Sequence, residues 1–208
     1  IYLANPDNPT GTYFRVDEFD AFMLRVPERV LVLLDEAYFE YAQNVKDFPD
    51  SMHYRYDNVI TLRTFSKAYG LAGFRVGYGF GHQDLIGNLL KVKLPFEPAI
   101  PAQSAAIAAL DDVEYIENTL SINNLGMELI TSHLEKYNLR YIESVTNFVT
   151  IVFNDSIQAK EFTQTMLENG IILRHLIAFG LPECVRVTIG TIIENEFFIE
   201  KLSKVMEK

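Results

Sequence analysis

Three short apolar segments constrain the fold of this chain more than any other feature, because each ends abruptly in polar residues. They are Ile1–Ala4, Leu31–Leu34 and Val59–Leu62, and each is continuous enough for a buried strand. Between the first two, residues 16–26 carry apolar side chains at helical spacing, which predicts a βαβ unit. Ligands of open α/β sheets bind at the carboxyl ends of the strands. We therefore expect the polar residues that follow the three segments to form a ligand-binding edge.

A glycine-rich, hydroxylated loop runs from Thr64 to Gly77, directly after the third segment. It lacks helical periodicity, so its backbone can approach a ligand closely. The hydroxyls of Thr64 and Ser66, together with the guanidinium of Arg75, suit a bound phosphate monoester. Lys67 would lie beside that anion, either as a counter-ion or, in a partly desolvated site, as an amine that forms a Schiff base with a carbonyl compound.

Four motifs, in this order and spacing, resemble the fold-type-I aminotransferases that depend on pyridoxal phosphate, and most closely the histidinol-phosphate branch of that family. The motifs are Asn5–Thr12, Asp35–Tyr38, Thr64–Gly73 and Val185–Thr191. The resemblance covers all 208 residues. It implies an α/β fold, with part of a large, mostly parallel cofactor-binding domain in residues 1–112. A long connecting helix and a smaller C-terminal α/β domain would follow in residues 113–208.

The resemblance also implies roles for individual residues. Lys67 would bind the cofactor covalently and then act as the base that moves the substrate proton. Asp35 would keep the pyridine nitrogen protonated, while Asn8 and Tyr38 would hydrogen-bond the phenolic oxygen of the cofactor. The residues expected to hold the cofactor phosphate are Thr64, Ser66 and Arg75.

Two arginines are candidates for substrate binding. Arg186 interrupts an apolar strand, where an unpaired cation is costly, so it requires an anion. By resemblance, Arg186 matches the arginine that binds the anionic group of the substrate, and Arg174 matches a second arginine near it. Two guanidiniums suit a phosphate monoester. The implied reaction, in histidine biosynthesis, moves an amino group between histidinol phosphate and the amino-group partner, glutamate or 2-oxoglutarate. A purely structural role for Arg174 is an equal alternative.

Two other functions are compatible with the same motifs. A pocket that accepts an imidazole can also admit a phenyl ring, so an aromatic amino-acid aminotransferase of the same fold is one alternative. The family pattern also extends before Ile1, with a loop that completes the phosphate site and an aromatic residue that stacks on the cofactor. We therefore expect a fragment, and a module for folding or dimerisation is the second alternative.

The composition of the chain bears on its partners and its cellular location. The formal net charge of −10 disfavours nucleic acid and anionic membranes as partners. The single cysteine, Cys184, cannot form an internal disulfide, which favours a reducing cytoplasm. No apolar run reaches the length of about 18 residues that suggests a transmembrane helix. The histidines lack the paired spacing of metal ligands. Since family members are usually homodimers, the resemblance implies a homodimer.

The rest of the chain yields a coarse pattern of elements. Residues 76–80 should form an antiparallel strand, because the connection from Leu62 shows no helix pattern and a parallel crossover of about a dozen or more residues usually contains one. Residues 39–56 have no clean periodicity and are interpreted as a surface loop with one helical turn at most. Thr191 and Glu194 have capping-box spacing at the start of the last helix. Further helices are expected over residues 82–93, 102–110, 113–137 and 156–169, and further strands over 147–153, 170–174 and 184–189.

Overall fold

The computed structural model describes residues 1–53 and 56–207, and the chain divides into two units. The first unit comprises Ile1–Asp7 and Tyr13–Asn118. The second unit combines Asn8–Thr12 with the chain from Thr119 onward. The short segment Asn8–Thr12 thus belongs with residues that follow it by more than a hundred positions, which the order of the motifs alone does not indicate.

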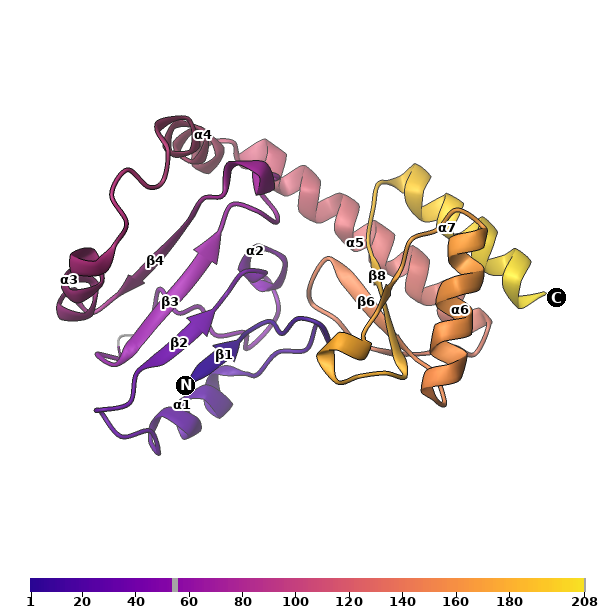
Figure 1. The fold of residues 1–208 in the computed structure, drawn as a ribbon, viewed down its shortest axis with the longest axis horizontal. Helices are drawn as coiled ribbons and strands as arrows, with labels where there is room; N and C mark the ends of the chain where they lie inside the picture. The colour runs from indigo at the N-terminus through magenta and orange to yellow at the C-terminus, as the bar shows by residue number, and fades with distance from the viewer. Residues whose placement is uncertain (54–55, 208) are drawn as a thin grey trace. The chain divides into compact units, whose positions relative to one another are not determined.

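The sheet of the first unit has the strand order β1-β2-β3-β4 (Figure 1). Its strands are β1 (Tyr2–Ala4), β2 (Val32–Asp35), β3 (Val59–Thr64) and β4 (Gly77–Gly81). The first three strands are parallel and β4 is antiparallel to β3, which confirms the predicted direction of that strand. In the register, Ala4 lies opposite Asp35 and Asp35 lies opposite Leu62. The polar segments that follow these strands therefore start at one edge of the sheet.

Helix α1 (Val16–Met23) covers part of this sheet because its apolar residues recur at helical spacing. Phe19 and Met23 are buried in one cluster with Val32, Leu34 and Val59 of the strands. The other helices among the described residues of the first unit are α2 (Phe39–Ala42), η1 (Ala72–Phe74), α3 (Gln83–Val92), α4 (Ile100–Asp111) and the start of α5 (Val113–Lys136). Strand β1, helix α1 and strand β2 therefore form the βαβ unit that the first two apolar segments, and the helical spacing between them, predicted.

The interpretation of residues 39–56 as a surface loop is wrong for several buried side chains, although its single helical turn is confirmed. After α2 (Phe39–Ala42) the chain is irregular, but the side chains of Phe39, Ala42 and Phe48 are buried. The rings of Phe39 and Phe48 lie 6.2 Å apart, and Tyr13 lies 5.8 Å from Phe48. Burial in an irregular segment has no fixed period, so the sequence pattern did not reveal it. Residues 54 and 55, which the same interpretation covered, lie outside the described part of the chain.

The second unit has a fully antiparallel sheet in the order β5-β6-β8-β7. Its elements after α5 are β5 (Arg140–Ile142), β6 (Phe148–Val152), α6 (Ser156–Glu168), β7 (Arg174–His175), η2 (Ile177–Phe179), β8 (Cys184–Thr188) and α7 (Ile192–Met206). One apolar core lies between the sheet and the helices, and it includes Ile130, Leu134, Val149, Met166 and Leu202. The capping box is confirmed: Thr191 Oγ1 accepts from the Glu194 backbone, and the Glu194 carboxylate accepts from the Thr191 backbone at 2.7 Å.

The strand predicted over residues 170–174 is mostly wrong, since only Arg174 of that range lies in a strand. Gly170 has a φ of +87°, and the backbone N–H of Ile171 donates to the carbonyl of Met166 at 2.9 Å. These residues therefore terminate α6 in a left-handed turn of the kind that favours glycine. Strand β5 was not predicted at all, because three residues are too few to establish an alternating pattern.

Candidate functional site

Asp35 ends strand β2 and presents its carboxylate at the edge of the first unit's sheet. One oxygen accepts the backbone N–H of Ala37 at 3.0 Å, and the other accepts the hydroxyl of Tyr2. Burial, followed by the hydrogen bond and charge of Asp35, raises the pKa of Tyr2 to about 12, so Tyr2 stays a donor. Sequence reasoning missed Tyr2, although the two side chains share one face of neighbouring parallel strands.

The loop after β3 is closed by its own hydrogen bonds. The backbone N–H of Ser66 donates to Thr64 Oγ1 at 3.1 Å, and the N–H of Gly70 donates to the carbonyl of Lys67 at 3.0 Å. This conformation leaves the Lys67 side chain exposed, with its Nζ 5.3 Å from the centre of the Tyr38 ring. Lys67 and Tyr38 come from different loops, so the sheet edge brings together two residues predicted for one site.

Arg75 has an unusual backbone conformation for a residue with a side chain. Its φ is +53°, in the left-handed region, which costs a non-glycine residue about 1 to 2 kcal/mol. The guanidinium Nη1 donates to the carbonyl of Ala72 at 2.9 Å and to the hydroxyl of Ser66 at 3.4 Å. The structure thus brings Arg75 to the hydroxyl with which the sequence analysis paired it. Strain of this kind is often retained at ligand sites.

The first unit therefore gathers a defined set of donors and acceptors around the ends of β2 and β3. Asp35 supplies a carboxylate, Lys67 an amine, and Tyr38 a phenol ring beside that amine. The loop adds a guanidinium in contact with a hydroxyl. These groups match the chemistry of a ligand that has a basic ring nitrogen, a carbonyl and a phosphate.

The second unit holds the other three predicted site residues. Arg174 on β7 and Arg186 on β8 lie directly opposite each other, so their side chains share one face of the sheet. Both line a groove of about 580 Å³. The side-chain oxygen of Asn8 accepts from Nη1 of Arg186, and the hydroxyl of Thr150 donates to the carbonyl of Pro9 at 2.7 Å. These bonds attach the Asn8 segment to the second unit.

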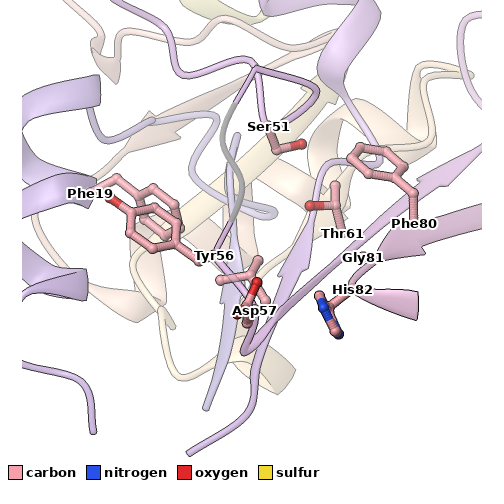
Figure 2. A pocket seen from close by; sticks show the side chains of 9 residues that line it. Phe19, Ser51, Tyr56, Asp57, Thr61, Phe80, Gly81 and His82 are labelled. Carbon is pink, nitrogen blue, oxygen red and sulfur yellow. The ribbon is translucent and has the colours of Figure 1, made fainter. Parts of the chain in front are cut away.

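A smaller cavity of about 70 Å³ lies elsewhere in the first unit (Figure 2). Figure 2 shows Ser51, Thr61, Phe80 and His82 around it, and Phe19 and Tyr56 lie on its other side. No predicted site residue is among the described residues that line it. We therefore do not place the candidate site there.

The described residues contain no group of three or more His, Cys, Asp or Glu side chains that is arranged to hold a metal ion. Over the same part of the chain, no helix combines the length and the apolar character needed to cross a bilayer.

Comparison with known proteins defines the class. Residues 1–202 match the family model for aminotransferases of class I and II, and the chain belongs to that family. It is 43% identical to histidinol-phosphate aminotransferase 1 of Nitrosococcus oceani, with all of this chain and 56% of that protein covered. It is also 43% identical to histidinol-phosphate aminotransferase 2 of Carboxydothermus hydrogenoformans, with 57% of that protein covered. The chain thus spans just over half the length of these curated relatives.

Solved structures agree with this assignment. The histidinol-phosphate aminotransferase of Sinorhizobium meliloti, solved in complex with pyridoxal-5'-phosphate, matches 99% of this chain and 56% of its own, with a TM-score of 0.91 and 32% identity. A variant of the Thermus thermophilus aspartate aminotransferase matches with a TM-score of 0.83 at 22% identity, which shows a shared fold alone. The fold-type-I architecture that the motifs implied is confirmed.

Proposed function

We propose that this chain carries the pyridoxal-phosphate and substrate residues of an aminotransferase that acts on histidinol phosphate. The observation that carries the proposal is the position of the Lys67 amine beside Tyr38, at the sheet edge where Asp35 ends the neighbouring strand. The names of the relatives support the substrate. The donor set of the first unit fits the ring nitrogen, carbonyl and phosphate of this cofactor.

Each cofactor residue has a distinct role in the proposal. When bound, pyridoxal phosphate supplies an electron-accepting ring that stabilises negative charge on the substrate carbon. Lys67 binds the cofactor carbonyl and, once released, takes the proton from the substrate carbon at its Nζ. Asp35 keeps the pyridine nitrogen protonated, and the hydrogen bond from the Ala37 N–H holds this carboxylate in place. Tyr38 and Asn8 hydrogen-bond the phenolic oxygen.

The phosphate and the substrate are assigned to different residues. Thr64, Ser66 and Arg75 bind the cofactor phosphate, and the contact between Arg75 and Ser66 supports this assignment. Arg174 and Arg186 bind the anionic groups of the substrate, histidinol phosphate or glutamate and 2-oxoglutarate. Their opposite positions on β7 and β8 favour a dianionic group such as a phosphate monoester.

The oligomeric state and the cellular location are also part of the proposal. Helix α4 exposes large apolar side chains, with Ile100 at 78% and Ile107 at 65% exposure, which supports association into a homodimer. The only cysteine, Cys184, is buried and free, which supports a reducing cytoplasm.

Covalent trapping tests the cofactor site. The chain is incubated with pyridoxal phosphate, reduced with borohydride and mapped by peptide mass. We expect one adduct, on Lys67, that is absent in Lys67→Arg and retained in the control Lys91→Arg, which changes an exposed lysine of α3. Equal labelling of many lysines, or none on Lys67, would overturn the proposed cofactor site.

Turnover then tests the substrate. Histidinol phosphate and phenylalanine are compared as amino donors, with 2-oxoglutarate as acceptor, in the wild type and in Arg174→Met. We expect the variant to raise the KM for histidinol phosphate more than that for phenylalanine, because only the former carries a phosphate. An equal loss for both would assign Arg174 a structural role. Preference of the wild type for phenylalanine would favour the aromatic aminotransferase. Cofactor binding without turnover of either donor would leave only a binding or folding module.

A further inference from the structure

A buried ionic cluster lies directly behind the candidate cofactor site of the first unit. Glu36 is 0% exposed and Arg63 is 8% exposed. Nε of Arg63 donates to Glu36 Oε2 at 2.8 Å, and Nη2 lies 2.7 Å from the same oxygen. Glu36 follows Asp35 in the chain, and Arg63 precedes Thr64. The ion pair thus joins two residues that are each adjacent to a proposed cofactor contact.

The strand geometry explains why this pair can act on the site without touching the cofactor. Successive side chains along an extended segment point to opposite faces, so Glu36 and Arg63 project away from the face of Asp35 and Thr64. The backbone N–H of Glu36 also donates to the carbonyl of Leu62 at 2.9 Å. The carboxyl ends of β2 and β3 are therefore joined twice, by a backbone bond and by a buried ion pair.

Arg63 also contacts the segment that carries Tyr38. Its Cζ lies 3.4 Å from the centre of the Phe39 ring, and Phe39 follows Tyr38 in the chain. Nη2 donates to Asp50 Oδ1 at 2.8 Å, which ties the loop after α2 to the same guanidinium. Cation–π contact with a desolvated guanidinium is directional and strong enough to orient an aromatic ring. One arginine thus holds the ends of β2 and β3, the start of α2 and the loop at Asp50.

We propose that Arg63 and Glu36 are positioning residues that hold the Asp35–Tyr38 segment and the Lys67 loop at the spacing the cofactor requires. The inference rests on the proposed function for its biological meaning, but its structural claim stands on the contacts above. A buried ion pair contributes little net stability compared with apolar residues of similar size, because burial removes both charges from water. Its advantage is a fixed geometry, which a site built on two separate loops needs.

Two variants separate a positioning role from a role in stability: one removes the ion pair, and the other lowers stability elsewhere in the same sheet. Glu36→Met/Arg63→Met replaces the pair by apolar side chains of similar size and leaves no unpaired charge at these positions. Val32→Ala removes buried apolar atoms at the other end of β2, where it lowers stability without touching the cluster. Both are studied by thermal melting, by hydrogen exchange without cofactor, and by titration with pyridoxal phosphate.

We expect the double variant to melt near the wild type, yet its amide hydrogens in residues 35–42 and 64–75 should exchange faster. Its affinity for pyridoxal phosphate should fall at least about tenfold, since small displacements of positioned groups have large effects. Val32→Ala should melt earlier but keep wild-type exchange in both segments and wild-type affinity. Should the double variant not fold, Glu36→Gln, which keeps the shape of the side chain, should show the same faster exchange to a smaller degree.

Unchanged exchange in both segments of the double variant, or of Glu36→Gln if only that variant folds, would overturn the inference. Exchange is read without cofactor, so this result decides the matter even if the wild type binds no pyridoxal phosphate. Absence of binding by the wild type would instead count against the proposed function. Equal loss of affinity in Val32→Ala and the double variant would assign the ion pair a general structural role and would also overturn the inference.

Discussion

Replacing Glu40 with glutamine is expected to remove a pH dependence of unfolding that a single buried carboxyl causes. Glu40 lies in α2 and is 4% exposed, and its Oε2 makes no hydrogen bond to the described residues. Burial is the main cause that raises its pKa from 4.5 to about 7, and the charge of Glu36 adds to it. The charge of Arg63 acts in the opposite direction but does not cancel the effect of burial.

The sign of the effect follows from the number of bound protons. Between pH 4.5 and about 7, the folded state keeps the proton of Glu40 while the unfolded state has lost it. The free energy of unfolding therefore falls as the pH rises through this window and becomes constant above it. A shift from 4.5 to about 7 corresponds to a total loss of about 3 kcal/mol above the window, because each pKa unit is worth about 1.4 kcal/mol.

The assay is urea unfolding of the wild type and Glu40→Gln between about pH 5 and about pH 8, followed through the transition of the first unit. Glutamine keeps the shape of the side chain but cannot ionise. The variant should therefore gain about 2 to 3 kcal/mol relative to the wild type across this range. Glu28→Gln, at an exposed position of the same unit, is the matched control and should run parallel to the wild type.

A difference between Glu40→Gln and the wild type that stays constant with pH would refute the reasoning. It would mean that Glu40 titrates alike in the folded and unfolded states, and hence that burial does not act on this carboxyl as the structure indicates. A difference that grows as the pH falls would reverse the sign and would require Glu40 to be ionised and paired. Glu36, whose pKa burial also raises, is present in both proteins and largely cancels in the comparison.

Four further substitutions probe close packing and capping, each read by chemical denaturation. Gly126→Ala should lower the free energy of unfolding by about 1 to 3 kcal/mol, because a Cβ there would lie 2.4 Å from Nδ2 of Asn195. Gly87→Ala should instead raise it by about 0.5 to 1 kcal/mol, because Gly87 lies in α3 with open space around it. Gly77→Ala should destabilise the first unit and slow Lys67 labelling, since the new Cβ would meet a backbone carbonyl at 2.6 Å. Thr191→Ala should lower the free energy of unfolding by about 1 kcal/mol, because it removes the N-cap of α7. An unchanged midpoint of denaturant unfolding would contradict that role.

Most of the sheet in the first unit was predictable because its strands are short and their patterns are local, although only β2 and β3 are mostly buried. Continuous apolar segments ending in polar residues indicated β1, β2 and β3, and the helix-free connection indicated the antiparallel β4. Arg75 and Ser66 were both candidates for one phosphate site because they lie in one glycine-rich loop, and the structure brings them into contact. Local signals of this kind depend on a few neighbouring residues, so the sequence displays them directly.

Segments without a period were harder to predict. Phe39 lies in the single turn of α2 and Phe48 in the irregular segment after it; both are buried, although residues 39–56 show no clean periodicity. The link between Tyr2 and Asp35 depends on the strand register, because 33 residues separate the two side chains. A register can be derived only after the pairing of β1 with β2 is known. Sequence patterns could therefore suggest the carboxylate but not the donor that holds it.

Arg63 shows what the rule that a buried cation requires an anion can predict from sequence, and what it cannot. An arginine inside an apolar strand requires an anion, and this argument singled out Arg186 but applies equally to Arg63. The apolar segment ends at Leu62, whereas β3 continues to Thr64, so Arg63 lies within the strand. Its acceptors are Glu36 and Asp50, which lie 27 and 13 residues away in the chain. Burial of a cation thus predicts that an anion must be present, but only the pairing of strands and the course of the loops determine which residue supplies it.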